Sequence, residues 1–163
     1  MLSIQNHQKR LPYLSRQLRY RAKKVLREVG LQNAEISVLL CDDATIQELN
    51  LEWRDIDKPT DVLSFPLLEP LEGKEQAIAS QIKDLEIPPM LGDIVISVDT
   101  CIRQAKEWNH SVIEEAIRLW IHGLLHLCGY DHIDNSDAIQ MKTKEEELLS
   151  IFRGSKITPL VQN

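Results

Sequence analysis

Apolar residues recur along the chain with two different periods, which predict alternating strands and helices. Short runs rich in β-branched residues predict four strands, at residues 2–6, 35–40, 62–66 and 92–98. Helical spacing predicts five helices, at residues 11–29, 44–53, 100–108, 112–127 and 136–151, and a weaker sixth around 77–85. This order predicts an α+β fold, with a small mixed sheet of about four strands packed with five to six helices.

The helix predicted over 112–127 differs from the others because it is apolar nearly all round from Ala116 to Leu127. Ser111 and Glu114 have the spacing of a capping box and predict where this helix begins. A helix without a polar face must be buried, so we expect it at the centre of the fold. The expected N-caps of the other helices are Asp42 or Asp43, Asp99, and Asn135 or Ser136.

Residues 68–90 mix charged residues with prolines and predict a mobile excursion from the fold. A lid beside a functional site is one interpretation. An insertion without function is the favoured one, because long surface loops cost little free energy.

Composition adds limits to this picture. A chain of 163 residues with 43% hydrophobic residues predicts one domain, over 1–152, followed by a flexible tail over 153–163. There is no run of about 18 apolar residues and no apolar signal region, so we expect a cytoplasmic protein that does not bind membranes. Its three cysteines lack C-x-x-C spacing and are expected to be reduced thiols.

Charge is distributed unevenly. The formal net charge is −6, whereas residues 1–33 alone carry +7. The overall acidity argues against a protein that coats nucleic acid, although a local basic face can still attract RNA. The candidate RNA-binding residues lie opposite the apolar side of the first helix, and they are Arg16, Arg19, Lys23 and Arg27. A merely solvated face is the commoner explanation of such a stripe.

Three of the five histidines lie within eleven residues. His122 and His126 are four residues apart, so on a helix they project side by side. Gly129 can end that helix in the left-handed conformation, and the chain can then present His132 from a third direction. Three imidazoles that leave a fourth position open are typical of a catalytic zinc site, with one ion per chain. Another divalent transition metal can occupy the same nitrogens. The alternative is that buried histidines merely cap a helix end.

The residue after the first histidine argues against peptide hydrolysis. The spacing is similar to that of metzincin proteases, which have a glutamate general base where this chain has Gly123. A metal that polarises a phosphate oxygen fits better, especially with a cationic side chain beside it. Arg54 stands at a helix-to-loop junction and can serve this role, or it can form a surface ion pair with Asp55 or Asp57. Cys128 is interpreted as a small buried hydrophobic residue and not as a ligand.

Three stretches together resemble one known family. Residues 122–132 (HGLLHLCGYDH), 50–66 (NLEWRDIDKPTDVLSFP) and 91–97 (LGDIVIS) are similar to the signatures of the bacterial YbeY family. The resemblance implies a metal-dependent endoribonuclease of ribosomal RNA maturation, single-strand-specific, with ribosomal RNA and the ribosome or its associated proteins as partners. It also implies that His122, His126 and His132 bind zinc and that Arg54 acts on RNA. Residues 68–90 are longer than is usual in the family, and the basic first helix belongs to its more variable part.

Two other functions remain open from the residues themselves. One is a zinc hydrolase of another substrate, such as a protease that recruits a base from elsewhere, for which Asp131 is the nearest carboxylate in sequence. The missing glutamate argues against it. The other is a non-catalytic zinc protein that binds the ribosome or a protein partner. The open coordination position argues against that one.

Overall fold

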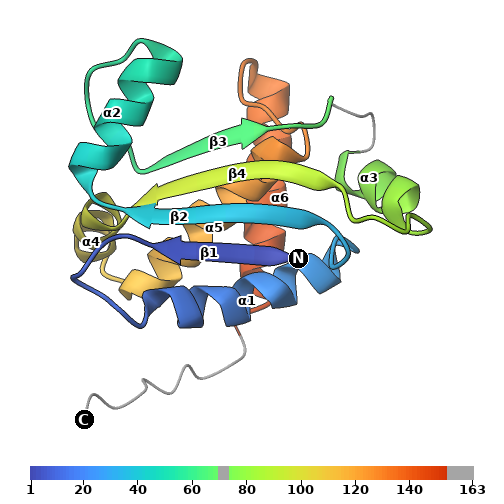
Figure 1. Cartoon of the computed structure of the whole chain (residues 1–163), viewed down its shortest axis with the longest axis horizontal. Coiled ribbons are helices and arrows are strands. Elements are labelled where there is room, and N and C mark those ends of the chain that lie inside the picture. Colours follow the sequence, from blue (N-terminus) through green and yellow to red (C-terminus); the bar gives the residue numbers. More distant parts are fainter. Residues whose placement is uncertain (70–73, 154–163) are drawn as a thin grey trace.

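A mixed four-stranded sheet frames the protein in the computed structural model, which describes residues 1–69 and 74–153 (Figure 1). The strands are β1 (Leu2–Asn6), β2 (Glu35–Cys41), β3 (Val62–Pro66) and β4 (Met90–Ser97). Their order in the sheet is β1-β2-β4-β3, so β1 and β3 form opposite edges. β1, β2 and β4 run parallel, and β3 pairs antiparallel with β4.

Six helices are found in the described residues. They are α1 (Leu14–Glu28), α2 (Asp43–Arg54), α3 (Lys74–Ile82), α4 (Val98–Glu107), α5 (Val112–Leu127) and α6 (Asn135–Ser150). The α+β prediction and the four predicted strands are therefore confirmed. None of the helices in 1–69 and 74–153 is both long and apolar enough to span a bilayer.

The two faces of the sheet have different environments. Figure 1 shows α5 and α6 behind the sheet and α1 along its β1 edge. The main core lies on the α5 side, where α5 packs against β3 and β4 and α1 packs against β1 and α5. Val38 of β2 and Ile94 of β4 are buried in this core. On the other face, α2 covers a smaller apolar cluster through Ile46, which packs with Leu63 and Val95. Most of the apolar surface is thus buried between the sheet and the helix that carries two of the histidines.

The central position predicted for α5 is confirmed. Ser111 caps this helix, and the side chain of Glu114 hydrogen-bonds back to the backbone N–H of Ser111, as in a capping box. Gly123 lets α5 approach the sheet closely. A Cβ atom added at this residue would lie 2.9 Å from Cγ2 of Ile94 in β4. The close approach fixes the depth at which the C-terminal turns of α5 sit in the protein.

Two predicted helix caps are wrong by one or two residues. Ser97, not Asp99, caps α4, because β4 passes into this helix without a loop and its last residue accepts the bond from the first turn. The Asp99 carboxylate instead accepts a bond from the backbone N–H of Asp43 and pairs with Arg10. Asp134 caps α6, one residue before the predicted positions.

The segment predicted to be an excursion contains a packed helix. Ile78 and Ile82 of α3 are buried in the main core. Glu75 is buried as well, and its carboxylate accepts a hydrogen bond from the Tyr130 hydroxyl at 2.8 Å and pairs with Lys144 at 3.0 Å. Thus α3 is tied to the chain that leads to His132 and to α6. The flexible tail predicted over 153–163 lies, apart from its first residue, outside the described residues.

Candidate metal centre

The end of α5 and the loop after it bring the three predicted histidines together. His122 and His126 project from the last two turns of α5. Gly129 adopts φ +91°, which glycine tolerates at a helix end, and the Tyr130 N–H donates back to the Leu125 carbonyl at 2.9 Å. The chain then turns and presents His132. Each ring can offer one nitrogen to a common point, and these atoms all lie within 4.8 Å of one another.

Hydrogen bonds to the outer ring nitrogens orient two of the imidazoles. Nδ1 of His126 donates to the Tyr130 carbonyl at 3.0 Å, and Nδ1 of His122 contacts a carboxylate oxygen of Glu145 in α6. Because a carbonyl can only accept, the proton of His126 stays on Nδ1 and leaves the Nε2 lone pair free. Such outer partners are the usual way in which proteins fix metal-binding histidines.

The inner nitrogens have the separation that a metal requires. Nε2 of His122 lies 3.1 Å from Nε2 of His126. Two nitrogens bound to one tetrahedral zinc at 2.0–2.1 Å are about 3.3 Å apart. When Nδ1 of each ring donates to its outer partner, both Nε2 lone pairs are available to one cation at this separation. The cluster therefore fits a divalent transition metal.

Burial controls the charge of the groups at this centre. It lowers the pKa of His126, and the neighbouring His122 and His132 lower it further, so the ring favours the neutral form that binds metals. Burial also raises the pKa of Cys128 to about 12, so this thiol stays protonated. Cys128 is only 1% exposed and packs in the main core, which confirms its interpretation as a buried hydrophobic residue.

The structure gives a packing reason for glycine after the first histidine. The side-chain direction of Gly123 points at Ile94 in the sheet and leaves no room for a glutamate there. The Asp131 carboxylate, the nearest in sequence, accepts a hydrogen bond from the backbone N–H of His132 at 2.6 Å. It therefore braces the loop that carries the third histidine.

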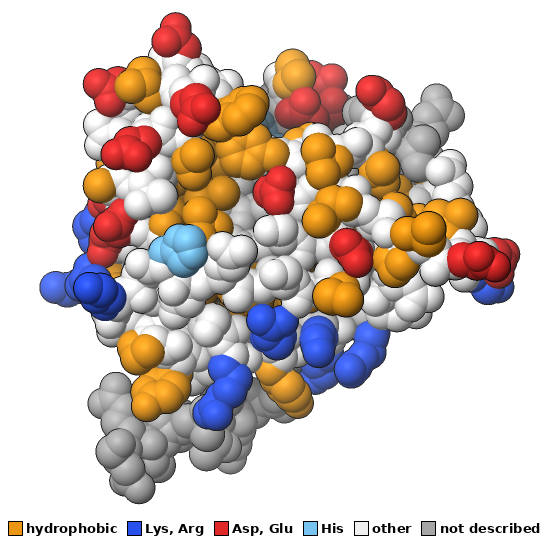
Figure 2. Space-filling model, viewed as in Figure 1, with side chains coloured by type: hydrophobic (Ala, Val, Ile, Leu, Met, Phe, Trp, Pro, Cys, Tyr) orange, Lys and Arg blue, Asp and Glu red, His pale blue; other side chains and the backbone are white. Residues whose placement is uncertain are grey.

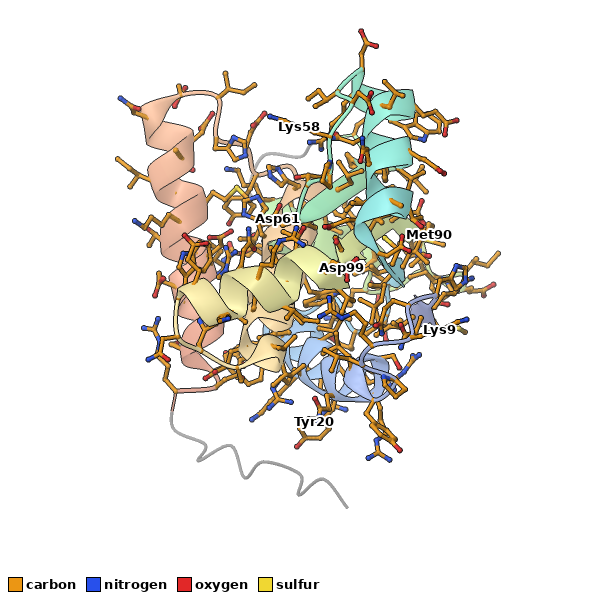
Figure 3. The ribbon with its side chains drawn as sticks, turned by 90° about the vertical axis from the view of Figure 1, so that its left-hand side faces the viewer. Lys9, Tyr20, Lys58, Asp61, Met90 and Asp99 are labelled. Atoms are coloured by element: carbon orange, nitrogen blue, oxygen red, sulfur yellow. The ribbon has the colours of Figure 1, made fainter. Side chains whose placement is uncertain are left out.

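Arg54 is the last residue of α2 and is exposed. Within residues 1–69 and 74–153 it forms no ion pair, so the alternative of a pair with Asp55 or Asp57 is not observed. The C-terminal end of α2 and the N-terminal end of α6 both project beyond β3 (Figures 1 and 3), and Figure 3 places Lys58, which follows α2, at this edge. Arg54 and the loop of His132, which leads into α6, thus lie at the same edge of the sheet.

The four basic residues of α1 lie elsewhere. Arg16, Lys23 and Arg27 are exposed, whereas Arg19 is half-buried and donates to the backbone carbonyl of Leu2 in β1. α1 runs along the β1 edge, opposite the β3 edge, so the structure does not bring these residues to the histidines.

Sequence reasoning missed the residues that support the histidines. Glu145 lies in a run of three glutamates, and only the packing of α6 against α5 shows which of them meets a histidine. A general signal did exist, since ligand histidines almost always have a carboxylate or carbonyl partner. The sequence, however, offers 25 acidic residues and no indication of which one lies near.

Known proteins are similar to this chain over most of its length. Residues 3–153 match the family described as Endoribonuclease YbeY. Proteins of that name are 44% identical in Clostridium acetobutylicum, over 78% of this chain and 81% of the relative, and 46% identical in Treponema denticola, over 82% and 81%. The solution structure of TM1509 from Thermotoga maritima is similar with a TM-score of 0.58 and 25% identity, covering 99% of this chain and 100% of that one. The matched range spans the positions of the three histidines and Arg54 and all of the sheet except Leu2, and the chain therefore belongs to the YbeY endoribonuclease family.

Proposed function

We propose that this protein is a zinc-dependent endoribonuclease that cleaves single-stranded RNA during ribosomal RNA maturation. The observation that carries the proposal is the convergence of three imidazoles, two of them held through Nδ1, in a chain of this family. Residues 1–152 would form a single hydrolase domain around this centre. Ribosomal RNA, the ribosome or its associated proteins as partners, and a cytoplasmic location are part of the same proposal.

The residues have separate roles in this mechanism. His122, His126 and His132 hold the metal, while Glu145 and the Tyr130 carbonyl keep the rings oriented. Zinc, when bound, supplies Lewis acidity toward oxygen atoms of water and phosphate. We assign zinc because three nitrogen ligands with one open position are its usual catalytic set, with one ion per chain.

Arg54 binds the substrate in this proposal. A guanidinium presents paired N–H donors that match two oxygens of a phosphate. The same donors stabilise the negative charge that builds on the phosphate during cleavage. Because Arg54 has no acidic partner among the described residues, its charge is available to RNA.

The test is single-turnover cleavage of a labelled single-stranded RNA by wild type, Arg54→Glu and Arg54→Lys. We expect Arg54→Glu to slow cleavage by about 100-fold or more, the usual effect of removing a donor to transition-state charge. Zinc content and melting temperature should stay unchanged because Arg54 is exposed and outside the cluster. Arg54→Lys keeps the charge but not the paired N–H donors of the guanidinium, so its rate separates bidentate contact from a simple charge effect.

Two controls accompany this measurement. His126→Ala should lose both zinc and cleavage, because two imidazoles hold the ion less well than three. The exposed Lys106 of α4, changed to Glu, should leave the rate as in wild type. Full activity in Arg54→Glu with zinc retained would remove this residue from the mechanism. Casein cleavage that depends on the histidines and ignores RNA competitor would replace the nuclease with a protease.

A further inference from the structure

The outer surface of α1 carries cations and tyrosines in one line. Tyr13, Arg16, Tyr20, Lys23 and Arg27 follow one another at separations of three or four residues, which places them within about 80° around the helix. Tyr13 and Tyr20 are 71% and 72% exposed, and the three cations are exposed too. In Figure 3, Tyr20 projects away from the rest of the protein. We call these five residues the α1 stripe.

A groove of about 570 Å³ runs between α1 and the β1 edge, beside the α1 stripe. Arg19, Lys23 and Arg27 line its helix side, and Ser3 and Gln32 contribute polar groups. Arg19 is held in place by its bond to the Leu2 carbonyl. The volume lies within the range of small-molecule sites, roughly 300–1,000 Å³, so a nucleotide unit fits.

The charge of this surface is not neutralised by the protein. Arg16, Lys23 and Arg27 form no ion pair with any residue in 1–69 or 74–153. Glu28 is the only acidic residue among the first 33. Figure 2 shows Lys and Arg side chains gathered over α1, whereas Asp and Glu are concentrated around α2 and the upper edge. The surface is therefore complementary to a polyanion.

The two tyrosines favour single-stranded nucleic acid among polyanions. Unpaired bases stack on exposed aromatic rings, and every base has a face that can do so. An acidic protein surface has no series of bases that could stack on the two tyrosine rings. An anionic membrane would require apolar side chains on the outer face of the helix. In α1 these side chains, Leu14, Leu18 and Val25 among them, are buried in the core.

This surface is separate from the metal centre. The groove lies at the β1 edge, whereas the histidine-bearing end of α5 packs on β4, where Gly123 faces Ile94. Strand spacings of about 4.8 Å put the two edges about 14 Å apart. A single strand of several nucleotides can span this distance and contact both.

We propose that the α1 stripe and the groove beside it form a second RNA-contact surface, which holds the single strand that is cut at the metal centre. Phosphates occupy the groove beside Lys23 and Arg27, and bases stack on Tyr13 and Tyr20. The identity of the ligand as RNA rests on the proposed endoribonuclease function. The surface contributes to binding and takes no part in the chemical step.

The test is RNA binding by the full-length protein carrying Lys23→Glu and Arg27→Glu together. The probe is a fluorescent 2′-O-methyl single-stranded oligoribonucleotide, which resists cleavage, and its anisotropy is measured at several salt concentrations. We expect binding to weaken by about tenfold or more. The slope of log affinity against log salt should fall by about 1.4, since each phosphate contact to a single strand contributes about 0.7. Tyr20→Ala should weaken binding by about fivefold or more with an unchanged salt slope.

The matched control is Lys83→Glu with Lys106→Glu. Both lysines are exposed and outside the α1 stripe, and the change in net charge is the same. This variant should bind RNA like wild type, which separates a local contact from a general charge effect. The melting temperature of each variant shows that the fold is kept, and Lys23→Gln with Arg27→Gln provides a milder version of the first change.

Cleavage of an unmodified RNA separates this inference from the proposed function. The Lys23/Arg27 variant should need a higher RNA concentration for half-maximal rate and should reach the wild-type rate at saturation. Undiminished binding in this variant would overturn the second surface and leave the proposed nuclease intact. Loss of binding in it, together with a wild type that binds but does not cleave RNA, would support the surface and overturn the nuclease. A wild type that binds phosphatidylserine vesicles in preference to RNA would overturn the RNA assignment of the surface.

Discussion

At the scale of single residues, the proposed metal site is supported by a carboxylate that lies far from it in sequence. Glu145 contacts Nδ1 of His122 across 23 positions of the chain. A carboxylate in this position orients the ring and makes its other nitrogen a better donor to the metal. The affinity of the proposed site for zinc would therefore be determined partly in α6, outside the three histidines.

We predict that Glu145→Gln lowers the affinity for zinc by about 10- to 100-fold. A neutral amide orients the ring less firmly and lacks the negative charge that makes the imidazole a stronger ligand. Competition with a chromophoric chelator measures this change. Glu146→Gln, an exposed neighbour on the same helix, serves as the control and should bind zinc like wild type. Equal affinities in both variants would show that Glu145 does not support the ring.

The sequence was sufficient to find the histidines, and it was insufficient for their partners. His122 and His126 are neighbours through helix geometry, which is local and follows from spacing alone. Glu145 and Glu75 reach the site through the packing of separate helices, which spacing does not reveal. Arg19 is a further example: its spacing predicts a position on the exposed basic face, but its side chain donates to the backbone carbonyl of Leu2.

At the scale of elements, α3 is attached to the site by one buried carboxylate. Glu75 accepts from the Tyr130 hydroxyl and pairs with Lys144, which itself also pairs with the exposed Glu147. Burial and the neighbouring Glu75 carboxylate raise the pKa of Tyr130, so this hydroxyl keeps the proton that it donates. The helix predicted only weakly from the sequence is thus connected to the chain just before His132.

We predict that Glu75→Ala lowers the free energy of unfolding by about 2 kcal/mol, because two polar groups lose their buried partner. Urea denaturation measures it, with Glu86→Ala, an exposed acidic residue after α3, as the control. Zinc affinity should also fall in Glu75→Ala because Tyr130 holds His126 through its carbonyl. A stability equal to that of the control would mean that α3 is not anchored by this carboxylate.

The start of α5 could be predicted from the sequence better than the start of α4, because no loop separates β4 from α4. The start of α5 follows a loop, and its capping box was correctly identified. β4 continues directly into α4, so the N-cap of α4 is Ser97, the last residue of the strand. In the sequence, Ser97 belongs to the apolar run that predicts the strand. In α3 the helical pattern is weak because prolines and charges surround it, and the helix begins three residues before the predicted one.

At the scale of the whole molecule, the proposed metal would link the buried α5 to the exposed loop that follows it. Two of the proposed ligands belong to the buried α5, and the third belongs to the exposed loop before α6. A ligand that binds only the folded state adds stability in proportion to the logarithm of its excess over Kd. Zinc at 100 times its Kd would add about 2.7 kcal/mol.

We predict that zinc raises the melting temperature of the metal-free protein by about 5–10 °C at that excess, from the usual 2–4 °C per kcal/mol for a domain of this size. Scanning calorimetry with EDTA and with added zinc measures it. His126→Ala should show little of this increase. The same increase in that variant would place the stabilising metal elsewhere in the protein.

The class of the fold followed from the sequence, but the arrangement of its sheet did not. The strands and the buried α5 are visible as periodic patterns, and they are sufficient for an α+β assignment. The order β1-β2-β4-β3 depends on pairings between distant segments, such as Val38 with Ile94. It places the basic α1 and the histidine cluster toward opposite edges, which no local pattern indicates.

The contact between Gly123 and Ile94 also limits the routes by which this site could change during evolution. A metzincin-like protease would require a glutamate at this position. Here the backbone of α5 is so close to β4 that a longer side chain would displace the sheet before it reached the metal. A single exchange at position 123 therefore disturbs the core without supplying a base. The nuclease and protease forms of this histidine motif are separated by a repacking of the helix on the sheet, so neither is one mutational step from the other.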